Sequence, residues 1–313
     1  MSSASDSDAD RRRLAALRPA LDARSRTLQA VRGFFTDRGF VEIDTPVRIP
    51  APALELHIDA IPSADQYLRT SPELHMKRLL AAGYERIFQL GPCFRAGERG
   101  RLHNPEYTML EWYRSPGDYL SVLDDAEGLV PGVARELLGD SRVRFGGRSI
   151  DLARPWPRMA VRDAFVQHAG WDPVAAFDAD RFDFDLVGKV EPCLPLDRPV
   201  VLMDYPIEAG ALARPKPGQP TVAERWELYI GGVEIANAFS ELTDASEQRR
   251  RFEQCAAERR AMGRAVYPMD EAFLAALERS MPASGGVALG IDRLVMILAG
   301  CASLDDVIAF RDG

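Results

Sequence analysis

The chain has 313 residues, of which 46% are apolar and 27% charged, the composition of an ordinary globular protein. Its formal net charge of −8 argues against a protein that holds nucleic acid by bulk electrostatic attraction. No signal-peptide h-region follows the polar start "MSSASDSDADRRR", and no apolar run approaches the roughly 18 residues of a membrane span. The four cysteines lack C-x-x-C spacing, which gives no support to a zinc site. We therefore expect a soluble cytoplasmic protein without a membrane partner.

Residues 1–13 are small, polar and charged, and we expect them to be disordered, within a lead-in that reaches residue 24. Helical periodicity and capping residues predict helices at 25–38, 71–83, 118–139, 159–169, 245–262 and 270–280. Alternating or continuous apolar runs predict strands at 54–60, 86–96, 107–114, 201–206 and 224–239, and a strand running into a helix at 285–298. Three prolines and two glycines in 209–223 predict a mobile loop.

The order of these elements predicts the fold class. The strands are joined mostly by hairpins, such as the one at Gly231-Gly232, and the helices lie outside them. This arrangement is typical of the α+β class, with one antiparallel sheet flanked by helices. We expect a single domain over residues 25–313.

Three separated segments resemble the signature motifs of one family, the class II aminoacyl-tRNA synthetases. They are "RGFVEIDTP" (38–46), "FRAGERGRLHNPEYTMLEWY" (94–113) and "GVALGIDRLVMI" (286–297). Their counterparts are a helix–strand–proline motif, F-R-x-E on a strand–loop–strand, and G-x-G-x-x-R opening a helix. "TSPELHMKRLL" and "GGVEIANAFSELTD" are similar, more narrowly, to the lysyl-tRNA synthetase branch. The resemblance covers roughly residues 25–311 and implies the catalytic core of that class.

The resemblance implies that the chain activates a carboxylic acid with ATP. The acid attacks the α-phosphate in line, and guanidinium groups held by a rigid sheet stabilise the negative charge that grows there. Arg95 would contact the α-phosphate and the reacting carboxylate, and Arg293 the far end of a bent ATP. Glu234 would hold Mg²⁺, a hard cation that prefers oxygen ligands. The remaining nucleotide contacts implied are Ala96, Gly97, Glu98, Asn104, Ile235 and Gly290.

The implied amino-acid pocket consists of Ser71, Pro72, Glu73, Tyr113 and Glu241. Two carboxylates and a phenol hydroxyl suit a substrate with two ammonium groups, because a desolvated cation needs paired acceptors. The pocket therefore favours lysine or a lysine isomer over aspartate.

Two positions depart from the family pattern. In "FRAGE" the glutamate comes one place late, at Glu98, so that either Glu98 reaches the adenine from a shifted loop or the contact is lost. In "ANAF", Ala238 stands where the family has glycine, and we expect its methyl group to tune the preference between α-lysine and β-lysine. The group that deprotonates the acceptor and the surface where the acceptor docks cannot be read from the sequence.

Only about 24 residues precede the helix predicted to open the first motif, and we expect these to be too few for the five-stranded anticodon-binding barrel of a lysyl-tRNA synthetase. We therefore expect no tRNA partner. A stand-alone core of this kind resembles the elongation factor P–(R)-β-lysine ligases, which implies β-lysine and ATP as substrates and elongation factor P as the acceptor. The alternatives are a truncated synthetase paralogue acting on tRNA, an ammonia-using amide synthetase and a non-catalytic regulatory paralogue. The resemblance also implies a homodimer, with Phe34, Phe35 and Val41 supplying apolar surface at its interface.

Overall fold

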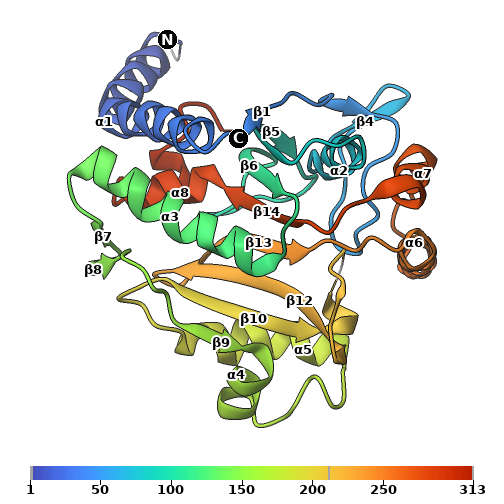
Figure 1. Cartoon of the computed structure of the whole chain (residues 1–313). Helices are drawn as coiled ribbons and strands as arrows, with labels where there is room; N and C mark the ends of the chain where they lie inside the picture. Colours follow the sequence, from blue (N-terminus) through green and yellow to red (C-terminus); the bar gives the residue numbers. More distant parts are fainter. Residues whose placement is uncertain (1–2, 211, 312–313) are drawn as a thin grey trace.

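A nine-stranded sheet forms the centre of the protein in the computed structural model, which describes residues 3–210 and 212–311 (Figure 1). The strand order is β1-β5-β6-β14-β13-β12-β10-β9, with β11 paired to β12. Neighbouring strands from β5 to β10 are antiparallel, and the two outer pairs, β1–β5 and β9–β10, are parallel. The strands are β1 (Val41–Glu42), β5 (Arg86–Phe94), β6 (Glu106–Arg114), β9 (Arg158–Ala160), β10 (Val200–Pro206), β11 (Pro215–Lys216), β12 (Gln219–Ile230), β13 (Val233–Ser240) and β14 (Gly285–Gly290).

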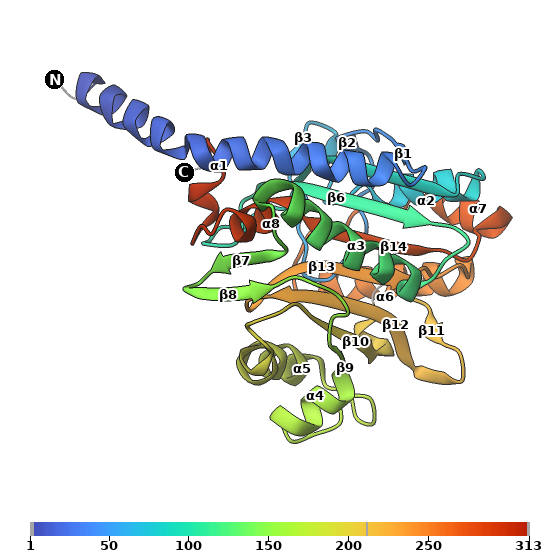
Figure 2. The ribbon, with the colours of Figure 1, turned by 60° about the vertical axis from the view of Figure 1, so that its left-hand side comes forward.

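Three helices cover one face of the sheet: α1 (Ser3–Thr36), α3 (Tyr119–Leu138) and α8 (Ile291–Leu298) (Figures 1 and 2). Alternate side chains of the strands point toward them. Phe88, Trp112, Trp226 and Val287 join residues of all three helices in the largest apolar cluster. Because packed apolar side chains fill this face, we expect the functional site on the other face of the sheet.

The remaining helices lie at the ends of the sheet. Helices α2 (Glu73–Ala81), α6 (Ala245–Ala261) and α7 (Glu271–Ser280) pack together at one end, and α4 (Val161–His168), α5 (Ala179–Asp185), η1 (Leu186–Val190) and η2 (Glu191–Cys193) lie beside β10 at the other. Short elements complete the fold: β2 (Arg48–Ile49), β3 (Pro62–Ser63), β4 (Gln66–Leu68), β7 (Arg142–Phe145), β8 (Arg148–Asp151), η3 (Ile207–Ala209) and η4 (Leu304–Asp306). No helix among the described residues is long and apolar enough to cross a membrane.

The hairpin β12–β13 turns where the sequence predicts it. Gly231 and Gly232 both adopt positive φ, 59° and 79°, which a two-residue hairpin turn requires and which glycine adopts without strain. The α+β class and its sheet flanked by helices are confirmed, although the two outer strand pairs are parallel rather than antiparallel.

Three local predictions are wrong. Residues 54–60 form no strand, because the loop turns to contact side chains of α6. Part of the predicted loop 209–223 is ordered as β11 and the start of β12, since backbone pairing compensates for its prolines. Phe35 is fully buried against Phe88 and Phe40 in the core of its own chain, so it cannot supply an interface.

The expected disordered lead-in also differs from the structure, in which α1 runs unbroken from Ser3 to Thr36 and its first half projects from the body (Figure 2). Aspartate–arginine pairs one turn apart, such as Asp8–Arg11 and Asp10–Arg13, favour this helix. Arg24, inside the predicted lead-in, donates to Asp292 at 2.5 Å and to the Thr108 hydroxyl at 2.7 Å. Residues 3–24 of the lead-in are therefore helical, and Arg24 ties the end of this segment to the folded domain, while residues 1 and 2 lie outside the described residues.

Arg24→Met should destabilise the protein, because it leaves the buried Asp292 carboxylate without its cation. We expect a loss of about 3 kcal/mol, the low end for breaking a buried pair, and a fall in Tm on the order of 6–12 °C. Arg26→Met is the matched control, since Arg26 makes only an exposed contact with the Glu136 carbonyl and should change stability by less than about 0.5 kcal/mol. Equal effects of both variants in thermal unfolding would contradict a special role for Arg24.

Candidate active site

The face of the sheet opposite the core carries a buried acidic pocket. Tyr113 and Glu111 come from β6, Glu241 follows β13, and Glu73 begins α2. Each of the four is at most 9% exposed. The structure thus brings together three of the predicted pocket residues, together with Glu111. The other two, Ser71 and Pro72, precede α2, where the Ser71 hydroxyl accepts a hydrogen bond from the Glu73 amide at 3.0 Å.

Lys77 is the cation of this pocket. Its ammonium group lies 2.5 Å from Glu73 Oε1 and also pairs with Glu241, and the side chain is 1% exposed. Burial by itself lowers the pKa of Lys77, but the two ion pairs raise it by more, so the pKa is raised and the lysine stays charged. Because it sits one helical turn after Glu73, sequence spacing suggests that pair, but nothing local indicates the contact with Glu241.

Glu111 is the carboxylate without a cation in the pocket. Its Oε1 accepts a hydrogen bond from the Tyr113 hydroxyl at 2.6 Å, whereas its buried Oε2 has no hydrogen-bond partner among the described residues. Burial, and then the charge of Glu73, raise the pKa of Glu111 to about 8. The sequence analysis missed Glu111, although its place two residues before Tyr113 on one strand puts both on the same face.

Gly286 leaves room for this arrangement. It lies between Tyr113 on β6 and Phe239 on β13 in the sheet. A Cβ atom at this position would clash with Glu241 Oε1 and with the Tyr113 ring. A glycine is therefore required for the phenol and the carboxylate to lie side by side.

Arg95, at the end of β5, adjoins the pocket. It pairs with Glu98 at 3.6 Å and lies over the Tyr107 ring at 5.2 Å. Its Nε is buried and has no hydrogen-bond partner in the described part of the chain, so a donor remains for an anion. Glu98 lies beside Arg95 because the Ala96–Gly97 turn, with Gly97 at φ 76°, brings the chain back.

Arg293 is held by protein groups on all sides. It donates to the carbonyls of Leu102 at 3.1 Å and Glu234 at 2.8 Å, and its third nitrogen lies 2.8 Å from His103 Nε2. Since arginine only donates, Nε2 of His103 is the acceptor and the imidazole is neutral. Burial and the Arg293 charge lower the pKa of His103, which agrees with that state. An anion at Arg293 would replace these contacts.

The other predicted nucleotide residues differ in how they face the site. The Asn104 amide donates to the Glu106 carbonyl at 2.5 Å and accepts from Arg311 at 3.3 Å. The Ile235 side chain lies in the core, so only its backbone can face a nucleotide. Gly290 precedes α8, and a Cβ there would meet no atom closer than 3.8 Å.

Two carboxylates on β12 and β13 offer oxygen ligands. Glu234 lies 3.5 Å from Arg293 with 43% of its side chain exposed, and Glu227 receives hydrogen bonds from Arg225, Tyr205 and Tyr229. Burial, and then the charge of Glu227, raise the pKa of Glu234 to about 7. Among residues 3–210 and 212–311, no group of three or more acidic, histidine or cysteine side chains is placed to hold a metal ion by itself. This donor set fits Mg²⁺, which one or two carboxylates hold together with substrate phosphates.

Ala238 does not face this site. Its side chain is fully buried in the core beneath α3, opposite Trp226 and Val287 in the sheet. The expectation that its methyl group tunes substrate preference is therefore wrong, because alternation along β13 points it to the core face.

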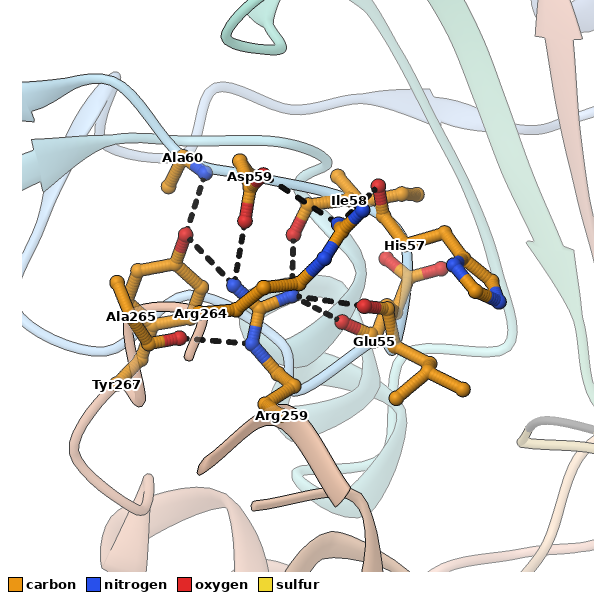
Figure 3. Close-up of polar contacts among 10 residues, drawn as sticks. Glu55, His57, Ile58, Asp59, Ala60, Arg259, Arg264, Ala265 and Tyr267 are labelled. Carbon is orange, nitrogen blue, oxygen red and sulfur yellow. Dashed lines mark hydrogen bonds and ion pairs between the residues drawn. The ribbon is translucent and has the colours of Figure 1, made fainter. Parts of the chain in front are cut away.

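The loop 55–60 borders the site and is held by Arg259 of α6 (Figure 3). This fully buried guanidinium donates to the carbonyls of Glu55 at 2.7 Å and Ile58 at 3.0 Å and to the Asp59 carboxylate at 2.5 Å. The Tyr267 hydroxyl accepts from the Ala60 amide at 2.7 Å. One arginine thus determines the path of the loop, and this contact spans 204 residues of sequence.

Known proteins resemble this chain along most of its length. The model of the family "tRNA synthetases class II (D, K and N)" matches residues 9–312. The chain is 41% identical, over 92% of its length, to the lysine–tRNA ligase of Moorella thermoacetica, but spans only 64% of that protein. It is 38% identical to the elongation factor P–(R)-β-lysine ligase of Proteus mirabilis and 37% to that of Hamiltonella defensa, over 92% of this chain and 93% of each relative.

Glu111→Gln should make stability less dependent on pH. The folded pKa of about 8 exceeds the unfolded value of about 4.3, so the folded state binds more protons between them and the free energy of unfolding falls as pH rises. The variant keeps an acceptor for Tyr113 and carries no charge. Between about pH 5 and pH 9, the free energy of unfolding of the variant should rise relative to that of wild type by more than about 1.4 kcal/mol, which corresponds to one pKa unit.

Urea unfolding across this pH range measures the difference. Glu106→Gln, at an exposed position of the same strand, is the control and should follow wild type. If Glu111→Gln also followed wild type, Glu111 would titrate as an ordinary carboxylate.

Proposed function

Because this chain belongs to the family of class II tRNA synthetases (D, K and N), we propose that it activates (R)-β-lysine with ATP and transfers it to a lysine of elongation factor P. The observation that carries the proposal is the buried acidic pocket around Lys77, which lies beside Arg95 on one face of the sheet. The match to elongation factor P–(R)-β-lysine ligases over 93% of their length supports this substrate and acceptor.

In the first step a carboxylate oxygen of the amino acid attacks the α-phosphorus of ATP. A phosphorus–oxygen bond forms, the bond to pyrophosphate breaks, and an aminoacyl-adenylate remains. Arg95 stabilises the charge on the α-phosphate, since its Nε has no competing partner in the described chain. Glu227 and Glu234 would hold Mg²⁺, which would supply positive charge to the phosphate oxygens.

The acidic pocket selects a diamino acid. Lys77 neutralises Glu73 and Glu241 in part, which leaves Glu111 as the carboxylate that can receive the distal ammonium of the substrate. An aspartate side chain would meet these carboxylates with like charge. The pocket therefore disfavours the amide-synthetase alternative.

In the second step the ε-amine of the acceptor lysine attacks the activated carbonyl carbon. A carbon–nitrogen bond forms, the bond to AMP breaks and the amine loses a proton. A lysine amine with pKa about 10.4 is only about 0.1% neutral at physiological pH, so the site must favour its neutral form.

The second candidate is the charging of lysine tRNA. The 41% identity to the Moorella lysine–tRNA ligase favours it. Both candidates share the adenylation step and differ in the acceptor, so the acceptor decides between them.

The acceptor is tested with purified chain, ATP, Mg²⁺, β-lysine and elongation factor P. Intact-protein mass spectrometry should show one addition to elongation factor P, and replacing its acceptor lysine with arginine should abolish the addition. Arg95→Ala is the mechanistic control and should lose about 10²–10³-fold in ATP–pyrophosphate exchange, the effect of removing one preorganised donor. If lysine tRNA were charged efficiently while elongation factor P stayed unmodified, the tRNA candidate would replace our proposal.

We also propose that the chain forms a two-fold homodimer through the end of α1 and β1. Strand β1 is the outermost strand of the sheet, and Val41 on it is 50% exposed. An isologous contact would cover this apolar edge.

Val41→Glu should therefore convert a dimer into a species near 34.6 kDa in light scattering at micromolar concentration. Val166→Glu is the matched control, because Val166 is 51% exposed on α4, far along the sheet order. A wild-type mass near that of one chain would refute the dimer.

A further inference from the structure

The loop 55–60 places Glu55 at the junction of the two halves of the site. Arg259 binds the backbone carbonyl of Glu55 (Figure 3). The Asp59 carbonyl accepts a hydrogen bond from the Ala96 amide at 2.7 Å. On its other side Leu54 packs in one apolar cluster with Leu74, the residue after Glu73. Glu55 therefore lies between the start of α2 and the turn that follows Arg95.

The neighbouring carboxylates already have cations. Glu98 pairs with Arg95, and Glu73 pairs with Lys77. Glu55 differs, because its carboxylate forms no hydrogen bond and no ion pair with any residue that the structure describes. It is partly buried, and both the positive charge of Arg95 and the negative charge of Glu73 act on it.

A partly buried carboxylate without a partner is unfavourable unless a ligand completes it. Burial raises the pKa of Glu55 to about 7, with the charge of Arg95 lowering it and the charge of Glu73 raising it further. A bound ammonium group would favour the charged form and compensate for the lost solvation.

We propose that Glu55 is a substrate-binding residue that receives the amino group nearest the reacting carboxylate. The inference rests on the proposed function, since it assumes that the substrate carboxylate lies at Arg95 and the distal ammonium at Glu111. The near amine is then attached one or two carbons from the carboxylate that Arg95 binds, within the region between Arg95 and Glu73 where Glu55 lies. Glu55 thereby distinguishes a diamino acid from a monoamino acid of the same length.

The test compares two ligands that differ only in this amine. β-Lysine carries both amines, whereas 6-aminohexanoate keeps the carboxylate and the distal amine and lacks the near one. Glu55→Gln should lower kcat/KM for β-lysine in ATP–pyrophosphate exchange by about 10- to 100-fold, the effect of losing a hydrogen bond to a charged group. The inhibition constant of 6-aminohexanoate should change less than about 2-fold.

Two further variants control for the loop itself. His57→Gln alters an exposed side chain of the same loop and should leave both ligands unaffected. Glu55→Asp keeps the charge and should retain more β-lysine activity than Glu55→Gln, even if both lose some stability.

The outcomes separate this inference from the proposed function. If wild type shows no exchange with any diamino acid, the proposed function fails. If wild type is active and Glu55→Gln weakens both ligands equally, or neither, Glu55 does not bind the near amine and the inference is wrong.

Discussion

The buried ammonium group of Lys77 is the interaction on which the site depends. Three carboxylates that are each at most 9% exposed surround it, and such groups could not remain together without a cation. Lys77 joins α2 to the segment after β13 through Glu73 and Glu241. The same contact therefore ties a helix at the end of the sheet to its centre and sets the charge that a substrate meets.

The sheet makes this arrangement possible by separating its two faces. Along β6, Trp112 points into the core while Glu111 and Tyr113 point into the pocket. Gly286 on the next strand provides the space that the pocket side chains need. Because the strands are rigid and paired, the apolar face stabilises the fold and holds the polar face in place at the same time.

Arginines hold the loops around the site. Arg259 binds the loop 55–60, Arg311 donates to the carbonyls of Gly100 and His103, and Arg293 binds Leu102 and Glu234. A guanidinium group presents five donors in a rigid planar fork, so it can bind several carbonyls at once in a fixed geometry. The loop carrying Glu55 is therefore preorganised, whereas Arg293 would have to exchange its protein contacts for any contact with a phosphate.

Local sequence patterns determined the α+β class, most helices and the β12–β13 hairpin, whereas the residues expected at the ATP and amino-acid sites followed from the family resemblance. The periodicity of apolar residues and the φ requirements of glycine act over a few residues, so they are legible without the fold. Only the tertiary structure decided that Lys77 meets Glu241, that Arg259 reaches Glu55 across 204 residues, and that Ala238 faces the core. These contacts depend on strand register and helix placement, and a slip of one residue would turn every side chain of a strand to the other face.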